Sequence, residues 1–238
     1  MLPTWMPRGH HGPMTFSSAT PAPAAQTVRE ALSAALSLVF PTWCAGCDTP
    51  DTPLCAACRE ALMPHVRARR TGGLRVWSGL AFEGVAARTL RAAKEDGRTG
   101  LLRALAPALA AAVAAALAAS TAGPVALVPV PTSPGAMRRR GYRVVETIAR
   151  RADLPFRRLL AAGTGAADQR RLGRAERAQN VAGVMHAQPA RGLRVIVLDD
   201  VVTTGATLGE AERALTAAGA RVLGAATVAS TPRRRGES

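Results

Sequence analysis

Two adjacent carboxylates and a hydroxyl-rich turn offer the clearest chemistry in the sequence. Asp199 and Asp200 end a short, β-branched apolar run at residues 195–198, which predicts a strand buried on both faces. The turn that follows consists of Thr203, Thr204, Gly205, Ala206 and Thr207. A helical pattern over 206–218 then closes at Gly219, a residue typical of helix ends. Strand, compact turn and helix N-terminus together predict an anion site, because backbone N–H groups and the helix dipole point at the ligand.

The same segment indicates a ligand that carries both a phosphate and a sugar diol. Threonine hydroxyls add donors for the phosphate, and two carboxylates can hold a diol directly or through Mg²⁺. An ordinary strand and helix joined by a polar turn is the alternative, but paired carboxylates on a buried strand are costly without a ligand. We therefore expect a ribose 5-phosphate, with Asp199 and Asp200 at the ribose hydroxyls and residues 203–207 at the 5′-phosphate.

The four cysteines form two CxxC pairs, Cys44 with Cys47 and Cys55 with Cys58. Each CxxC turn places two thiolates on one side, and two hairpin ends of this kind can meet in a tetrahedral zinc site with four cysteine ligands. Gly46 suits the tight turn. Structural disulfides are the first alternative, and a cytoplasmic chain disfavours them. A thioredoxin-type redox pair is the second, and the duplicated CxxC disfavours it. The spacing thus predicts structural Zn²⁺.

A proline-rich loop at residues 128–137 leads into three consecutive arginines, Arg138, Arg139 and Arg140. Prolines restrict the backbone direction, and arginine makes bidentate phosphate contacts, so this loop is a candidate for a pyrophosphate group. A solvated basic helix start is the alternative. Residues 163–183 are also basic and Gly-rich, and we expect a mobile loop that closes over the ligand, with a plain surface loop as the alternative.

These candidates need a scaffold, and apolar periodicity predicts strands alternating with helices. The expected strands lie at a pair near 73–82, at 125–130, near 156–160, at 195–198 and at 221–229; the expected helices lie at 28–40, 85–94, 101–119, 138–152 and 206–218. Such alternation predicts an α/β fold with a parallel sheet and right-handed crossovers. Ligands then bind at the carboxyl ends of the strands, where both candidate loops begin.

Composition limits the classes of protein further. Of the 238 residues 48% are hydrophobic but only 3% aromatic, so we expect a core of Ala, Val and Leu. The net charge of +15 favours polyanionic partners, either nucleic acid or phosphorylated small molecules, although GC-rich codon usage explains arginine and alanine equally well. Scarce aromatics weaken the case for a protein dedicated to binding single-stranded nucleic acid.

Residues 101–119 come closest to a membrane span, but Arg103 and Pro107 interrupt them, so we expect no span. The N-terminus lacks signal-peptide order, which favours a cytoplasmic chain.

The segment at 199–207 resembles the loop that binds 5-phosphoribosyl 1-pyrophosphate (PRPP) in type I phosphoribosyltransferases. The wider order of motifs resembles the ComF family of competence proteins over about residues 30–230. It comprises Phe40-Pro41, the two CxxC pairs, Ala81-Phe82-Glu83-Gly84, residues 90–94, Gly97-Arg98, Val-Pro-Val-Pro at 128–131, Arg-Arg-Gly-Tyr at 139–142, Gln169, Arg177 and Asn180. One departure is Arg143-Val144, where that family usually has Asn-Gln.

The resemblance implies a small N-terminal zinc module joined to a type I phosphoribosyltransferase domain. We expect a disordered segment at 1–27, a helix plus zinc-binding module at 28–70, a phosphoribosyltransferase-like domain at 71–230 and a disordered basic tail at 231–238. The resemblance also implies binding of PRPP with Mg²⁺, transfer of ribose 5-phosphate to an acceptor, and a role in DNA uptake during natural transformation. The alternative is a non-catalytic competence protein that senses a nucleotide or binds single-stranded DNA or DNA-processing proteins. Both interpretations are compatible with an oligomeric protein.

Overall fold

The computed structural model describes residues 42–120, 123–163 and 185–232. Thr42–Ser238 forms one compact unit, and Met1–Pro41 is a separate unit outside the described residues. The helix expected at 28–40 and nearly all of the loop expected at 163–183 therefore lie outside the described part of the chain. The domain boundaries stay predictions.

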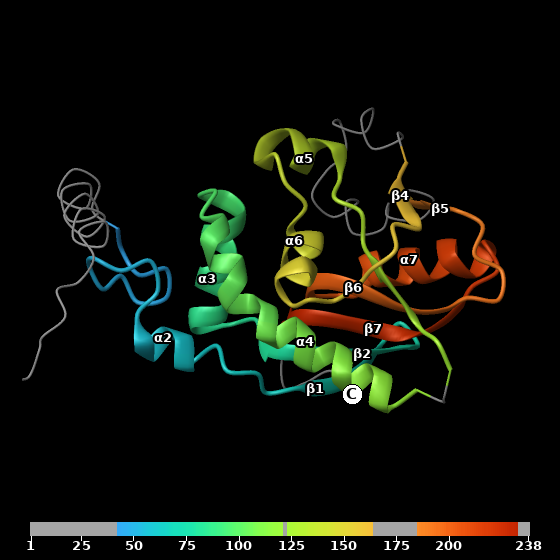
Figure 1. Cartoon of the computed structure of the whole chain (residues 1–238), viewed down its shortest axis with the longest axis horizontal. Coiled ribbons are helices and arrows are strands. Elements are labelled where there is room, and N and C mark those ends of the chain that lie inside the picture. The colour runs from blue at the N-terminus through green and yellow to red at the C-terminus, as the bar shows by residue number, and fades with distance from the viewer. Residues whose placement is uncertain (1–41, 121–122, 164–184, 233–238) are drawn as a thin grey trace, which may run out of the picture. The chain divides into compact units, whose positions relative to one another are not determined.

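A five-stranded sheet forms the centre of the described unit (Figure 1), with the strand order β1-β2-β7-β6-β3. Its strands are β1 (Arg67–Thr71), β2 (Leu74–Ala81), β3 (Ala126–Pro129), β6 (Arg194–Val202) and β7 (Arg221–Ser230). Neighbouring strands from β2 through β7 and β6 to β3 are parallel, whereas β1 forms an antiparallel hairpin with β2. The predicted α/β fold with a mostly parallel sheet is confirmed. The hairpin begins earlier than the pair expected at 73–82, because the chain already extends from Arg67.

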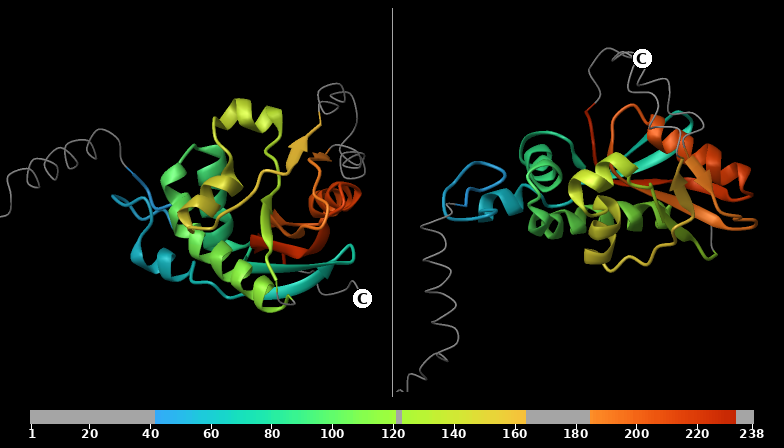
Figure 2. Two further views of the ribbon diagram at one scale, coloured as in Figure 1. Left: turned by 45° about the vertical axis from the view of Figure 1, so that its right-hand side comes forward. Right: turned by 90° about the horizontal axis from the view of Figure 1, so that it is seen from above.

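Helices cover the two faces of this sheet (Figure 2). They are α3 (Gly84–Glu95), α4 (Leu102–Ala118) and α6 (Val144–Arg151) on one face and α7 (Ala206–Ala217) on the other. Alternate residues of β6 divide between the two cores, because successive side chains of a strand point to opposite faces. Ile196 and Leu198 pack with the α3, α4 and α6 side chains, and Val195 and Val197 pack with those of α7.

The alanine-rich helix α4 is the central helix of the unit. With the short 3-10 turn η1 (Thr99–Leu101), it is long and apolar enough to cross a membrane by length and composition alone, and 50% of its most apolar window is buried. Leu105 and Leu109 are fully buried in the core shared with β2, β7 and α6. The helix continues through Pro107, which lies on its exposed side. This burial identifies α4 as a core helix, and the expected core of Ala, Val and Leu is confirmed.

The prediction of a single basic helix at 138–152 is wrong. Two helices occupy this region, α5 (Pro134–Arg140) and then α6. Ser133 caps α5 by accepting a hydrogen bond from the Ala136 N–H at 3.3 Å, and Pro134 occupies its first turn. Gly141 ends the helix with φ 74°, a left-handed conformation that favours glycine. These start and stop signals override the run of basic residues, which by itself favours a continuous helix.

A second, two-stranded sheet lies beside α7. It pairs β4 (Leu160–Ala162) with β5 (Met185–Ala187) in antiparallel fashion. The strand expected near 156–160 is therefore shifted towards the C-terminus and pairs outside the central sheet. Glu210 of α7 fixes β5, because its carboxylate accepts the Met185 N–H at 3.0 Å.

Candidate functional site

The two candidate loops leave the sheet at the same edge. Strands β3 and β6 are parallel neighbours in which Pro129 pairs with Leu198. The Val130 N–H continues this pairing, donating to the Leu198 carbonyl at 2.9 Å. The loop at 130–133 and the turn at 203–205 therefore follow the carboxyl ends of neighbouring strands, where α/β sheets bind ligands, with β6 continuing from Leu198 to Val202 before its turn begins.

The turn between β6 and α7 is compact and partly exposed. Thr203 and Thr204 are exposed, and the Thr204 hydroxyl accepts the Ala206 N–H at 3.4 Å. Gly205 adopts φ 85° and precedes the first turn of α7, to which Ala206 and Thr207 belong. A side chain at Gly205 would also overlap the Thr71 methyl group. Both the backbone conformation and the close approach of β1 thus require glycine here.

Arg69 of β1 holds the backbone of this turn. Its guanidinium donates to the Val202 carbonyl at 3.1 Å and to the Thr203 carbonyl at 2.9 Å. A further hydrogen bond of 2.9 Å reaches the Thr231 carbonyl beyond the end of β7. Arg69 therefore ties the turn to the neighbouring strands, a role that the sequence analysis missed because no local pattern marks it.

The two carboxylates occupy different environments. Strand β6 extends through Val202, so Asp199 and Asp200 lie within the strand rather than at its end. Asp200 continues the face of Leu198 towards α3, where its carboxylate forms an ion pair with the Lys94 ammonium at 2.8 Å. Asp199 is 9% exposed and accepts the Asp200 N–H at 2.8 Å.

Asp199 and Asp200 differ in charge state because only Asp199 is buried away from a cation. Burial, reinforced by the neighbouring charge of Asp200, raises the pKa of Asp199 to about 8, although the Asp200 N–H and the Lys94 charge oppose this rise. Asp200 instead faces a cation. The pair therefore places its negative charge on the α3 side of the strand. The assignment of both residues to ribose hydroxyls stays a prediction.

Of the three consecutive arginines, one is tied to α3 and two are exposed. Arg140 donates through Nε to the Lys94 carbonyl at 3.1 Å, while Arg138 and Arg139 are exposed. Tyr142, just beyond α5, donates its hydroxyl to the Ala93 carbonyl. The structure thus brings the basic loop and the Asp200 strand to the same end of α3.

Arg143 and Val144 both have structural roles at the start of α6. Arg143 lies 3.7 Å from the Glu146 carboxylate, and Val144 is buried in the core. Glu146 is itself buried and also pairs with Arg150 and Arg158. Residues 143 and 144 therefore stabilise the start of α6 instead of presenting amide side chains to the loop.

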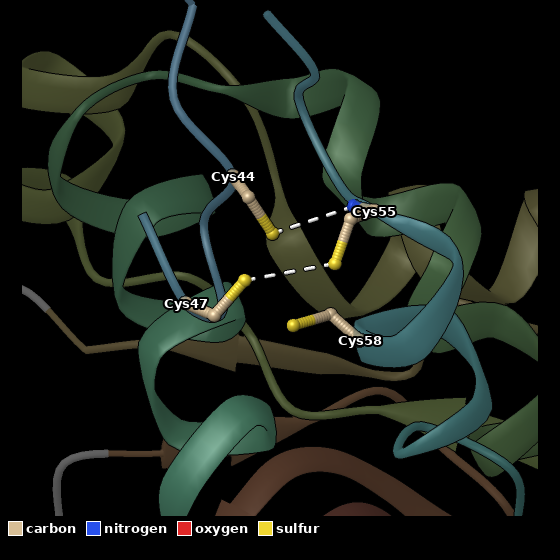
Figure 3. A group of neighbouring side chains, drawn as sticks. All are labelled: Cys44, Cys47, Cys55 and Cys58. Atoms are coloured by element: carbon tan, nitrogen blue, oxygen red, sulfur yellow. Dashed lines mark hydrogen bonds between the residues drawn. The ribbon is translucent and has the colours of Figure 1, made fainter. Parts of the chain in front are cut away.

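The four cysteines converge in one cluster (Figure 3), as the spacing predicted. Their Sγ atoms all lie within 4.8 Å of one another, and those of Cys47 and Cys55 are 3.6 Å apart. A tetrahedral zinc with Zn–S bonds of about 2.3 Å requires sulfurs roughly 3.8 Å apart. The Cys44 sulfur accepts N–H groups of Gly46 at 3.4 Å and Cys55 at 3.3 Å. The cluster could hold a metal ion.

The second cysteine pair lies on a helix, not on the hairpin end expected from the sequence. Cys55 caps α2 (Ala56–Glu60), and Cys58 lies inside it. Burial raises the pKa of the Cys44 thiol, but backbone N–H groups led by that of Cys55 outweigh it and lower the pKa to about 6. Burial and the neighbouring cysteines raise the pKa of Cys58. Four thiols this close together, two of them buried, favour a metal that takes thiolates.

The cysteine cluster is part of the main core. Cys44 and Cys58 are buried in the same hydrophobic cluster as Leu90 of α3 and Leu105 of α4. Arg98 strengthens this attachment by donating to the carbonyls of Trp43 at 2.8 Å and Pro53 at 3.1 Å. An exposed ion pair between Arg88 and Asp48 lies at the same junction.

With this geometry in place, comparison with known proteins assigns the fold to a family. The Phosphoribosyl transferase domain matches residues 106–238, more than half of the chain. The chain belongs to this family. The match covers the β6–α7 turn and the basic loop. Lys94, Arg69 and the cysteines lie outside the match, in the N-terminal part of the chain.

Two solved structures are similar to this phosphoribosyl transferase chain. Adenine phosphoribosyltransferase from Saccharomyces cerevisiae, complexed with adenine and an imino-altritol bisphosphate, is 14% identical over 74% of this chain and 89% of that chain, with a TM-score of 0.36. UMP synthase from Leishmania donovani is 17% identical over 72% of this chain and 29% of that chain, with a TM-score of 0.33. No curated protein matches the sequence. Likenesses at this level add nothing to the family assignment.

Proposed function

We propose that the chain binds PRPP with Mg²⁺ at the β6–α7 turn and transfers ribose 5-phosphate to a nitrogen nucleophile. The observation that carries this proposal is the left-handed turn at Gly205, which leads from the Asp199-Asp200 pair directly into the N-terminus of α7. In this arrangement residues 203–207 bind the 5′-phosphate, and the carboxylates accept hydrogen bonds from the ribose hydroxyls. The last turn of α5, which contains Arg138, Arg139 and Arg140, binds the pyrophosphate.

The reaction forms a bond between C1 of the ribose and the nitrogen of the acceptor. The bond between C1 and the pyrophosphate oxygen breaks, its electron pair leaves with pyrophosphate, and the nitrogen loses a proton. Positive charge develops on the sugar as the leaving group departs, so the ionised Asp200 carboxylate at its hydroxyls stabilises the transition state electrostatically. Mg²⁺ bound together with PRPP would supply positive charge that offsets that of the pyrophosphate.

We also propose that the cysteine cluster holds structural Zn²⁺. Four sulfur donors, their mutual distances and the N–H groups directed at Cys44 all fit this ion. All four positions of a tetrahedral zinc would be filled by Cys44, Cys47, Cys55 and Cys58, which leaves none for a substrate. Metal analysis of the purified chain should find about one equivalent of zinc. A normally folded, metal-free protein would contradict this proposal.

The resemblance to the ComF family supports a cytoplasmic role in DNA uptake, with single-stranded DNA or DNA-processing proteins as partners. The net charge of +15 is consistent with a polyanionic partner. The Arg143–Glu146 pair and the buried Val144 favour a second candidate function, in which the site senses PRPP or a nucleotide without turnover. Both candidates use the same turn, so substrate binding alone does not separate them.

Calorimetry with Mg²⁺ and PRPP tests the proposed site. We expect Asp200→Asn to weaken binding roughly ten-fold or more, because a hydrogen-bonded charged acceptor is lost. Gly205→Val should abolish binding, since its side chain overlaps Thr71 in a left-handed backbone. Gly209→Ala is the matched control, because nothing lies within 4 Å of a Cβ there. Equal PRPP affinity in all these proteins would place the site elsewhere. Pyrophosphate release across a panel of bases would then distinguish a transferase from a sensor.

A further inference from the structure

Lys94 is the only lysine of the chain, and it belongs to the last turn of α3. Its side chain crosses to the central sheet, where its ammonium lies 2.8 Å from Oδ2 of Asp200. The two side chains are only 23% and 15% exposed, so water screens the pair far less than a surface ion pair. An ion pair this shielded, between elements distant in sequence, holds the carboxylate in one orientation.

The backbone at the same point is held by the basic loop. The last carbonyls of a helix have no partner inside it. Here the Lys94 carbonyl accepts Arg140 Nε at 3.1 Å, and the Ala93 carbonyl accepts the Tyr142 hydroxyl. The end of α3 therefore contacts strand β6 through the Lys94 side chain, and Arg140 and Tyr142 through backbone carbonyls. The backbone at Lys94 is thus held by one neighbour and its ammonium by another.

We propose that Lys94 is a positioning residue that aims the Asp200 carboxylate at the ribose hydroxyls and so makes the site select ribose over 2-deoxyribose. The inference rests on the proposed function of the β6–α7 turn. With Oδ2 paired to Lys94, Oδ1 has no hydrogen-bond partner among the described residues and can accept a hydrogen bond from a hydroxyl. A paired, ionised carboxylate can only accept hydrogen bonds. A sugar that lacks a hydroxyl leaves this shielded acceptor unsatisfied, and sites of this kind reject such analogues strongly.

Binding of ribose 5-phosphate and of 2-deoxyribose 5-phosphate, measured by calorimetry, tests the inference without knowledge of the acceptor. We expect the wild type to bind the ribose compound roughly ten-fold or more tightly. Lys94→Gln should bring this ratio close to one, mainly by weakening the ribose compound, because the phosphate contacts are untouched. Lys94→Arg keeps the charge and should restore part of the preference. Arg88→Gln removes an ion pair with Asp48 outside the site and should leave the ratio unchanged.

A double variant identifies the route of the effect. If Lys94 acts through Asp200, Lys94→Gln combined with Asp200→Asn should lose no more selectivity than Asp200→Asn alone. A merely structural role for Lys94 predicts instead that both sugars weaken equally in Lys94→Gln, which would overturn the inference. An unchanged ratio in Lys94→Gln would overturn it too. Failure of the wild type to bind either sugar phosphate would instead refute the proposed site at the turn, and this inference with it.

Discussion

Replacing Gly46 by alanine tests how the two cysteine pairs fit together without removing a ligand. A Cβ at Gly46 would lie 2.5 Å from the Cys58 sulfur, 2.9 Å from Cγ1 of Val85 and 3.0 Å from Cβ of Cys58. Ordinary contacts between such atoms are about 3.5–4.0 Å, so all three are too close. A cysteine that ligates a metal cannot rotate away. The added methyl group must therefore push the two pairs apart.

The expected cost can be estimated from these contacts. Overpacking a well-packed core by one methyl group costs about 1–3 kcal/mol. A glycine-to-alanine change also restricts the unfolded chain, which offsets about 0.4–1 kcal/mol of that cost. We expect a net loss of about 1–2 kcal/mol in the free energy of unfolding of the zinc-loaded protein. If the loss falls wholly on the metal-bound state, zinc affinity should drop about 5- to 30-fold.

Competition with a chromophoric chelator measures zinc affinity, and urea denaturation measures stability. The control is Gly100→Ala, because nothing lies within 4 Å of a Cβ at that position. The control should match or slightly exceed the wild type in stability and bind zinc equally well. If Gly46→Ala behaves like Gly100→Ala in both assays, the prediction that Gly46 lies too close to Cys58 for a side chain is wrong.

Two further predictions concern charge. Burial raises the pKa of Glu146, but the arginines around it, led by Arg158, outweigh burial and lower it. Its contribution to stability is present above the unfolded pKa of about 4.3 and is lost as the pH falls through the lower folded pKa. Glu146→Gln should therefore flatten the acid limb of a stability–pH curve, and an unaltered limb would contradict this role. If arginines neutralise DNA phosphates, affinity in gel shifts should fall steeply with salt, and replacing Arg170, Arg171 and Arg174 by serine should reduce that slope. No binding to single- or double-stranded DNA at low salt would exclude a direct DNA role.

Local patterns predicted the parts of the site that are continuous in sequence. The apolar run at 195–198 and the following turn and helix lie where expected, because strand burial, a glycine turn and helix periodicity act over a few residues. The CxxC spacing likewise predicted the convergence of the cysteines. Local signals also existed for the break at Gly141, but the run of basic residues around it obscured them.

The contacts that complete the site were not predictable in this way. Lys94 and Asp200 meet only because α3 packs on the face of the sheet to which Asp200 points, and Arg69 reaches the turn only because β1 joins the sheet. Both cations stand in segments whose local pattern resembles an ordinary solvated face. Pairings between residues so far apart in sequence depend on the tertiary fold, on which hydrophobic periodicity carries no information.

The shared core of the cysteine cluster and α3 has a practical consequence for any attempt to dissect the protein. A shortened chain that began at residue 71 would keep most of the sheet but lose Arg69, which braces the turn, and the buried Cys44 and Cys58, which share a core cluster with Leu90. Removal of the proposed zinc would act on the same helix without cutting the chain. Since α3 carries Lys94, we expect zinc removal to weaken sugar binding at the proposed site, although this ion would not touch the substrate.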